Sequence, residues 1–335
     1  MSRKTKSSFS NSDPLPLIIV NPKSAAGSTR GKWASIASDV RTHFGPFSVA
    51  FTKSHGDGTA LAQRAIKAGR RFLIACGGDG TINEVANGIL TSGEDVELGL
   101  LPSGTGGDFR RTLGIPAEIR EAARALRLGL SKMIDVGRVA FRDHHGRPIS
   151  RYFLNVSSFG LAASIIGRVK SKSSLIWLPV DPLRGRASFA LSTLQEVVGL
   201  EPITVIVKLD DREERSLNSI NFCVANARFF GGGMKIAPKA KLDDGFFDIV
   251  NIGDLNTARV VFNAHTLYRG THFSLPEVKG TLARRIEVRS ASPGTQIHLE
   301  TDGELPGMLP AVYEIVPRAL KIRIPAAAKP PSQLK

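Results

Sequence analysis

The sequence predicts a doubly wound α/β layer followed by a mainly antiparallel β-sandwich. From residue 15 to about residue 136, short apolar segments of strand length alternate with segments of helical period. This alternation is typical of parallel strands covered by helices. After Asp135, strand-like runs follow one another with turns between them, as in a sandwich of antiparallel sheets. We therefore expect two domains that meet near residues 135–138.

In the first half, each expected strand is a short apolar run, and the segment after it repeats apolar residues every three to four positions. The turns between them are rich in glycine, proline and small polar residues. Strands are expected at residues 15–20, 47–51, 72–75 and 98–101, and helices at residues 33–43, 59–69, 82–90 and 119–128.

In the second half, most of the expected elements are strands, with two helical insertions among them. The pattern leaves open whether the last strands return to the first domain. The expected domains are therefore a basic flexible arm at 1–14, the α/β domain at 15–136, the sandwich at 137–325 and a flexible tail at 326–335. Strands are expected at residues 136–141, 152–158, 203–209, 219–225, 247–252, 285–288, 296–300 and 319–324.

The overall composition is that of an ordinary globular protein. The chain has 335 residues, of which 42% are hydrophobic and 22% charged, enough for two domains of normal size. No apolar run approaches the ~18 residues needed to cross a bilayer, and no secretory signal is recognisable, so we expect a cytoplasmic location. Cys76 and Cys223 lie in apolar runs without metal-ligand spacing, and we expect buried free thiols.

The most informative run is Cys76–Glu84, which directly follows an expected strand and leads into an expected helix. Its three glycines let the backbone approach a ligand, and the first amides of the helix point toward whatever lies there. A phosphate group is the natural ligand. Asp79 inside the turn would repel an anion unless a metal ion or a transferable proton lies between them. The residues alone leave a second interpretation equally open, a tight turn in which Asp79 caps the helix.

Two more turns of this kind follow expected strands. Residues 103–107 follow the strand at 98–101, and residues 21–27 follow the strand at 15–20. In an open parallel sheet, the turns at the carboxyl ends of the strands line one crevice, which is where ligands bind. We therefore expect the three turns to form one site.

These three turns resemble the catalytic domain shared by diacylglycerol kinases, sphingosine kinases and the bacterial lipid kinases of the same family. Together with the later motifs, the resemblance covers about residues 17–323, nearly the whole chain. One departure is Gly107, where the family's second turn usually has an asparagine. The resemblance continues in the same order and spacing at Asp135-Val136-Gly137, Tyr152–Gly160, Pro238–Asp248 and Asp302-Gly303-Glu304.

The resemblance implies an ATP-dependent, Mg²⁺-requiring kinase. Phosphoryl transfer needs the phosphates to be positioned and their charge neutralised. Asp79 would contact the catalytic Mg²⁺ through water, in keeping with the oxygen ligands that this ion prefers. The residues that would form the nucleotide site are Asn21, Pro22, Lys23, Ser24, Ala25, Thr52, Gly78, Asp79, Gly80, Thr81, Ile82, Asn83, Glu84, Ser103, Gly104 and Thr105.

The resemblance also implies catalytic acids and a second metal site in the later half. Glu304 would act as general base toward a lipid hydroxyl, with Asp302 as its metal or hydrogen-bond partner. By residue type alone, a hairpin turn with two solvated acids is the more common interpretation of Asp302-Gly303-Glu304, and the place of this step in the family pattern favours the catalytic one. A structural Mg²⁺ would be held by the Asp244 side chain and the carbonyls of Lys241 and Phe246, where the alternative is a charged β-turn.

The net charge of +15 indicates either that the protein binds an acidic partner or that its basic surface keeps it in solution. No nucleic-acid module is recognisable, and only 7% of the residues are aromatic, so we expect no nucleic-acid partner. An anionic membrane surface that presents a lipid substrate fits the resemblance. Cations and an apolar group around Trp177 alternate in residues 168–186, which could be a membrane contact, a lid or a plain loop.

The leading hypothesis is therefore a lipid kinase that acts on a diacylglycerol, a sphingoid base, ceramide or a related lipid. The alternatives are NAD kinase, which shares the Gly-Gly-Asp step, and a lipid or nucleotide sensor with the same fold. The motifs at 238–248 and 302–304 resemble the lipid branch, and the presence of every candidate carboxylate argues against a sensor. No histidine pairs with a plausible nucleophile, and neither glycine turn has dinucleotide spacing, which argues against hydrolases and dehydrogenases.

Overall fold

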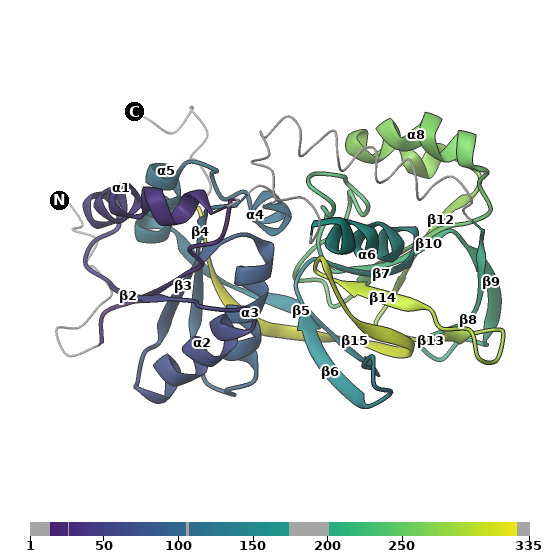
Figure 1. The fold of residues 1–335 in the computed structure, drawn as a ribbon, viewed down its shortest axis with the longest axis horizontal. Coiled ribbons are helices and arrows are strands. Elements are labelled where there is room, and N and C mark those ends of the chain that lie inside the picture. Colours follow the sequence, from purple (N-terminus) through teal and green to yellow (C-terminus); the bar gives the residue numbers. More distant parts are fainter. Residues whose placement is uncertain (1–13, 26, 105–106, 174–200, 327–335) are drawn as a thin grey trace. The chain divides into compact units, whose positions relative to one another are not determined.

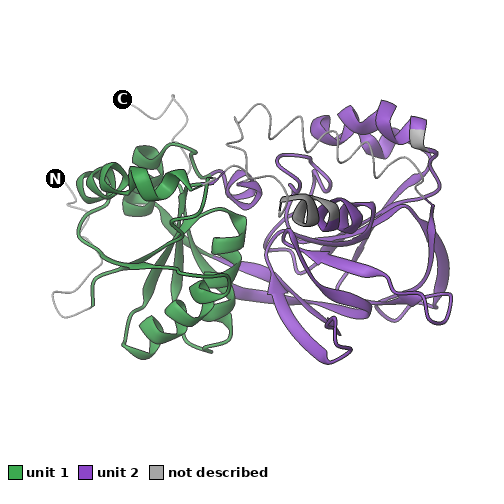
Figure 2. Cartoon of the chain, in the orientation of Figure 1, with its two compact units in different colours: residues 1–103, 115–132, 320–335 green, residues 104–114, 133–319 purple. Residues whose placement is uncertain are grey.

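The computed structural model describes residues 14–25, 27–104, 107–173 and 201–326, with only the backbone for residues 168–173. The predicted flexible ends fall almost entirely outside these ranges. The segment predicted as a membrane contact, a lid or a loop (residues 168–186) also lies outside them after Ser173. The described chain forms two compact units. Unit 1 comprises residues 1–103, 115–132 and 320–335, and unit 2 comprises residues 104–114 and 133–319 (Figure 2).

Unit 1 is built on a parallel sheet with helices packed on it (Figure 1). The strand order is β4-β3-β1-β2, and Lys321 and Ile322 of the last strand, β15 (Glu304–Ile324), extend the sheet by pairing in parallel with β4. The predicted α/β layer is confirmed. The other strands are β1 (Leu17–Val20), β2 (Ser48–Phe51), β3 (Phe72–Gly77) and β4 (Glu97–Pro102), and the helices are α1 (Ser28–His43), α2 (Asp57–Lys67), α3 (Asp79–Leu90) and α5 (Ile119–Leu128).

The central strands of unit 1 are buried because they have helices on both faces. Every residue of β1 and β3 is buried, as expected for continuous apolar runs in a parallel sheet. Helices α2 and α3 pack closely beside each other at Gly88, where an added Cβ would lie 2.6 Å from the Cβ of Ala62. A larger residue at 88 would therefore push the two helices apart.

Unit 2 is a sandwich of mostly antiparallel strands around an aromatic core, which confirms the predicted second fold class. Phe153 stacks on Phe247 at 5.6 Å between ring centroids, and Phe159 stacks on Phe222 at 5.0 Å. The strands are β5 (Leu130–Arg142), β6 (Pro148–Phe153), β7 (Val156–Gly160), β8 (Ile203–Leu209), β9 (Arg215–Ser219), β10 (Asn221–Ala225), β11 (Phe247–Ile252), β12 (Val278–Ala283), β13 (Arg285–Ser290), β14 (His298–Thr301) and most of β15, and the helices are α4 (Asp108–Leu113), α6 (Leu161–Ser173), α8 (Thr257–Arg269) and the short η1 (His272–Ser274).

The predicted strand at residues 152–158 is wrong in one respect, because it is divided into β6 and β7. The backbone amides of Leu154, Asn155 and Val156 turn away from strand pairing and donate to the carboxylate of Asp302. A periodic apolar pattern cannot reveal this interruption, since its cause is a side chain far along the chain.

Both cysteines are buried and free, as predicted. Burial raises the pKa of the Cys76 thiol to about 12 and also raises that of Cys223, so neither is a reactive thiolate. Among the described residues, no helix combines the length and the apolar character needed to cross a bilayer.

Candidate active site

In unit 1, the loops after β1 and β3 are joined by side chains at the carboxyl edge of the sheet. The Asn21 Nδ2 donates to Thr81 Oγ1 in the first turn of α3, at 3.2 Å. The other carboxamide atom, Asn21 Oδ1, accepts from the Lys23 amide at 2.9 Å and so shapes the loop that follows β1. The predicted nucleotide residues Asn21 and Thr81 therefore lie together, although they are far apart in the sequence.

The loop after β4 joins the same group. Ser103 Oγ lies 2.5 Å from Thr29 Oγ1, which in turn lies 2.7 Å from Ser24 Oγ. The Ser103 amide also donates to the Gly77 carbonyl at 3.0 Å. A chain of hydroxyls thus links the loops after β1 and β4, and Thr29 belongs to this group although the sequence reasoning missed it. Thr29 is almost fully buried, but a threonine early in a helix gives no distinctive signal in the sequence.

The turn between β3 and α3 is tight and open on one side. A Cβ on Gly77 would lie 2.5 Å from Thr81 Oγ1, whereas a Cβ on Gly80 would meet nothing within 4 Å. Asp79 is the first residue of α3, where a negative charge interacts favourably with the helix dipole. The amides that begin this twelve-residue helix form the kind of N-terminus that binds phosphate.

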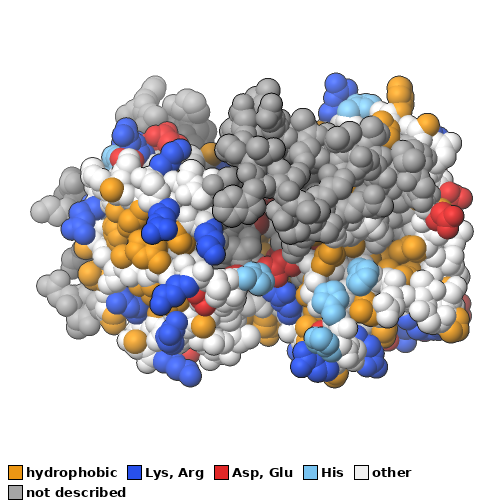
Figure 3. Space-filling model, in the orientation of Figure 1, with side chains coloured by type: hydrophobic (Ala, Val, Ile, Leu, Met, Phe, Trp, Pro, Cys, Tyr) orange, Lys and Arg blue, Asp and Glu red, His pale blue; other side chains and the backbone are white. Residues whose placement is uncertain are grey.

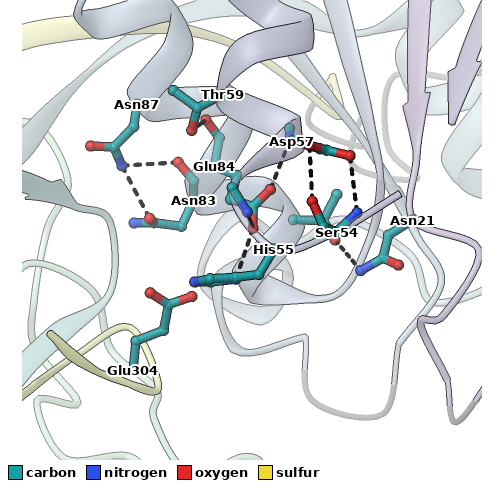
Figure 4. Close-up of polar contacts among 12 residues, drawn as sticks. Asn21, Ser54, His55, Asp57, Thr59, Asn83, Glu84, Asn87 and Glu304 are labelled. Carbon is teal, nitrogen blue, oxygen red and sulfur yellow. Dashed lines mark hydrogen bonds and ion pairs between the residues drawn. The ribbon is translucent and has the colours of Figure 1, made fainter. Parts of the chain in front are cut away.

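Glu84, predicted as a nucleotide residue, holds the neighbouring loop instead of lying exposed (Figure 4). Its two carboxylate oxygens each accept from a backbone amide at 2.8 Å, one from Gly56 and one from Gly58 at the start of α2. His55 Nδ1 lies 3.1 Å from the same carboxylate. Glu84 therefore caps α2 from the neighbouring helix α3.

The rest of that loop is ordered by Asp57. Its carboxylate accepts from the amides of Lys53 and Ser54 at 2.7 and 2.9 Å. The bond from the Lys53 amide is the main reason why the pKa of Asp57 is lowered. Thr52, which precedes the loop, is buried and donates its amide to Val20 at 2.9 Å. Thr52 therefore lies beside the end of β1, and its role in a nucleotide site stays a prediction.

We expect Glu84→Ala to lower the free energy of unfolding by about 2–4 kcal/mol, because two backbone amides lose a charged acceptor. Denaturant titration measures the change. The matched control is Glu121→Ala, which removes an exposed glutamate whose partner is Arg124 in the same helix and should change stability by less than about 0.5 kcal/mol. Equal losses in the two variants would show that Glu84 does not stabilise the loop.

Gly107, which stands where the family has an asparagine, has φ 70° and is the N-cap of α4. Glycine and asparagine are the residues that adopt this left-handed conformation most readily, so the backbone explains the exchange. Asp108 then accepts from the Gly232 amide at 2.8 Å and from Arg111 at 2.6 Å. Thr105 lies outside the described residues.

In unit 2, Asp302 is bound by backbone amides. Its carboxylate accepts from Leu154 at 2.7 Å, from Asn155 at 2.9 Å and from Val156 at 3.2 Å. Its own φ is +47°, an uncommon conformation for a residue with a side chain. The structure therefore gives Asp302 the role of fixing the turn that leads to Glu304.

Glu304 is the first residue of β15 and is mostly buried, with 18% of its side chain exposed. Its Oε2 lies 2.9 Å from Arg151 Nη1 on β6. This ion pair orients the carboxylate, and the Asp302 turn two residues earlier fixes the backbone. Such an arrangement suits a general base, which must be held in position.

The sequence reasoning missed Glu300, a buried carboxylate in the same turn. Its oxygens accept from Ser158 Oγ and from the Gly303 amide, both at 2.6 Å. Glu300 pairs with Ser158 across β14 and β7. The sequence gives little signal for it, because β14 is the short mixed strand His298–Thr301, and the partners that a buried carboxylate needs come from other segments.

The predicted metal loop lies in unit 2 beside a buried aspartate. Asp135 accepts from the Gly245 amide at 2.7 Å and the Arg318 amide at 2.8 Å, which fixes the loop. Asp244 Oδ1 accepts from the Phe246 amide at 3.2 Å. Within the described ranges, no three acidic, histidine or cysteine side chains cluster in a way that could hold a metal ion.

The loop is nevertheless compatible with a cation that takes one carboxylate and carbonyl oxygens. Burial, and secondarily the Asp244 carboxylate, raise the pKa of Asp248 to about 6. The Asp248 carboxylate therefore lies close enough to Asp244 and to the Lys241 cation to interact with both. Nearby, the buried Asn155 Oδ1 and Asn226 Oδ1 accept no hydrogen bond from the described part of the chain, and buried acceptors of this kind usually bind ordered water.

A cavity of about 410 Å³ lies within unit 2. Its wall includes Leu305, the residue after Glu304, and His144, whose Nε2 lies 3.0 Å from the Leu305 carbonyl. Most of the other residues that line the cavity are apolar or small. They are formed by Gly160, Ala163, Ser164, Gly167, Ile203, Thr295, Gln296, Ile297 and His298.

Two family models match the chain. The diacylglycerol kinase catalytic domain matches residues 16–139, and the YegS C-terminal NAD kinase beta sandwich-like domain matches residues 168–324. A curated relative, a diacylglycerol kinase of Bacillus subtilis (strain 168), is 30% identical over 309 residues, which are 92% of this chain and 95% of the relative. The chain belongs to the diacylglycerol kinase family.

As a member of the diacylglycerol kinase family, the chain is a kinase, a phosphotransferase that acts on an alcohol group. A diacylglycerol kinase of Staphylococcus epidermidis is 29% identical over 274 residues, with 82% of this chain and 80% of the relative covered. The fold is that of solved structures from Bacillus anthracis str. Sterne. One has a TM-score of 0.72 at 24% identity over 95% of this chain and 99% of that one. Another, a diacylglycerol kinase, has a TM-score of 0.68 at 22% identity over 96% and 100%.

Proposed function

We propose that the protein transfers the γ-phosphoryl group of ATP to the hydroxyl of diacylglycerol. The proposal that the protein binds ATP rests on two side-chain hydrogen bonds in unit 1. One joins Asn21 to Thr81, and the other joins Thr29 to Ser103. These contacts hold the loops after β1, β3 and β4 around the N-terminus of α3. Loops of this kind, with a helix N-terminus between them, bind phosphate groups.

Mg²⁺, when bound, would supply the charge neutralisation that phosphoryl transfer needs. Asp79 would hold the nucleotide-associated ion through water. The Asp244 carboxylate and the carbonyls of Lys241 and Phe246 would hold a structural ion in unit 2. The position of Asp244 in this loop, beside the Asp248 carboxylate, supports the second of these sites.

Glu304 would take the proton of the acceptor hydroxyl. The hydroxyl oxygen then forms its bond to the γ-phosphorus while the bond from that phosphorus to the bridging oxygen of ADP breaks. Arg151 keeps the carboxylate in position, and Asp302 keeps the turn in position. The largely apolar cavity next to Leu305 would hold a hydrocarbon chain of the acceptor. The names of the curated relatives favour diacylglycerol as that acceptor.

The test is a transfer assay with γ-labelled ATP, Mg²⁺ and dioctanoylglycerol in detergent micelles. We expect label in the lipid with the wild-type protein, and a loss of at least about a hundredfold in kcat for Asp79→Ala, which removes the carboxylate that organises Mg·ATP. No label in the lipid with the wild-type protein, or labelling that is unchanged in Asp79→Ala, would contradict the proposed roles.

The structural metal site has its own test. We expect Mg²⁺ to raise the melting temperature of the wild-type protein by several degrees above its value in EDTA, about 2–4 °C for each kcal/mol of binding linked to folding. Asp244→Ala should lose this increase, and the exposed control Asp254→Ala should keep it. An equal Mg²⁺ effect in both variants would remove Asp244 from the metal site.

A further inference from the structure

Helix α8 in unit 2 exposes the side chains that a helix normally buries. Phe262 is 79% exposed, Tyr268 is 51% exposed and Val261 is 44% exposed. The opposite face carries the half-buried Val260, Asn263 and Leu267, and Leu267 packs on a hydrophobic core cluster of unit 2. A surface helix of a globular protein usually turns its apolar stripe inward and its polar residues outward. Helix α8 has such an inner face, yet Phe262, Tyr268 and Val261 add a second, exposed apolar face.

The exposed residues form one continuous face. Ala258, Phe262 and His265 recur at helical spacing, and the rings of Phe262 and His265 meet edge to face with centroids 6.5 Å apart. Val261 and Tyr268 are seven residues apart and flank them. Figure 3 shows hydrophobic, basic and histidine side chains together at the upper right, where Figure 1 draws α8.

The same helix carries only positive charge. Its charged residues are Arg259 and Arg269, and no carboxylate occurs between Thr257 and Arg269. Arg259 is paired with Glu277, which leaves Arg269 as the cation at the end of the exposed face. Lys235 lies beside this end, since a Cβ on Gly270 would be 3.4 Å from its Cδ. The chain as a whole has a net charge of +15.

We propose that the face formed by Val261, Phe262, His265, Tyr268 and Arg269 docks on an anionic lipid bilayer. A helix of 13 residues is about 20 Å long, too short to span a hydrocarbon core of about 30 Å but suited to lying in the interface. The aromatic rings would enter the headgroup layer, and the cations would face lipid phosphates. A second copy is the weaker occupant, because a symmetric contact would bring like charges together. The inference rests on the proposed function in one respect, namely that the acceptor lipid resides in the bilayer.

The experiment is sedimentation of the full chain with vesicles of equimolar phosphatidylglycerol and phosphatidylcholine, and with vesicles of phosphatidylcholine alone. The variants are Phe262→Ser and Arg269→Glu, and the matched control is Leu128→Ser, which alters an apolar side chain that is 70% exposed on α5 in unit 1. We expect wild-type binding to the anionic vesicles, about tenfold weaker binding for Phe262→Ser and at least about fivefold weaker binding for Arg269→Glu. Leu128→Ser should bind as the wild type does.

Unchanged binding of Phe262→Ser to the anionic vesicles would overturn the inference, as would a wild-type protein that does not bind them. A loss of dimer in Phe262→Ser on gel filtration, with vesicle binding intact, would assign the face to a second copy. Transfer to dioctanoylglycerol in micelles is measured in parallel and should be equal in all three variants. A protein that binds vesicles through Phe262 but phosphorylates no lipid would contradict the proposed function and leave the docking surface standing.

Discussion

Glu304→Gln is expected to lower kcat for lipid phosphorylation by about 10²–10⁴-fold, the usual contribution of a positioned general base. Glutamine keeps the shape of the side chain and can still accept a hydrogen bond from Arg151, which lies 2.9 Å from Oε2 in the native protein. It cannot take a proton from the acceptor hydroxyl. ATP affinity should therefore stay near the wild-type value, which equilibrium binding measures separately from turnover.

The matched control is Glu314→Gln on the same strand. Glu314 also pairs with arginines, Arg138 and Arg285, and the hydrogen bond from Arg138 is the main reason why its pKa is lowered. It lies far along β15 from the Asp302-Gly303-Glu304 turn, so the kcat of this variant should change less than about twofold, in line with the small effect of a surface ion pair. Turnover of Glu304→Gln close to that of Glu314→Gln would exclude Glu304 as the base.

Asp302→Asn should be strongly destabilising although the two side chains have nearly the same shape. Asp302 Oδ2 accepts from the Leu154 amide, and Oδ1 accepts from the amides of Asn155 and Val156. In asparagine, one of these positions becomes an NH₂ group, which would face an N–H donor. We expect the free energy of unfolding to fall by about 3 kcal/mol, and kcat to fall as well, because the turn positions Glu304.

Asp210→Asn is the control for this change. Asp210 also has a positive φ, +51°, and also accepts from two backbone amides, those of Arg284 and Arg285. Both bonds end on the same oxygen, Oδ1, so asparagine can keep them. Denaturant titration should show a loss of at most about 1 kcal/mol for Asp210→Asn and no change in kcat. If the two variants lose equal stability, the three-amide account of Asp302 is wrong.

The sequence predicted the sheet of unit 1 well because its signals are local. Buried parallel strands read as apolar runs, and glycine turns mark their carboxyl ends. The contact of Asn21 with Thr81 confirms that two of the three predicted turns come together. The contact of Thr29 with Ser103 adds the third turn, the one after β4, and Thr29 itself carries no motif signal in the sequence.

Other features could not be read from the sequence because their causes are long-range. The break between β6 and β7 depends on Asp302, some 150 positions later, and the capping of α2 depends on Glu84. Glu84 occupies the position that the family motif assigns to the nucleotide site, yet both of its oxygens face backbone amides of another loop. The exposed apolar face of α8 is also invisible in the pattern, since periodicity reports an apolar face and not which side of the helix is covered.

The central claim is that this chain phosphorylates a diacylglycerol with ATP. One reaction tests it most directly, with equimolar diacylglycerol, sphingosine, ceramide and NAD present together, and ATP whose γ-phosphoryl oxygens carry ¹⁸O. Mass spectrometry then identifies which acceptor has gained the heavy phosphoryl group. The account predicts labelled phosphatidic acid as the main product, and labelled NADP without labelled lipid would contradict it.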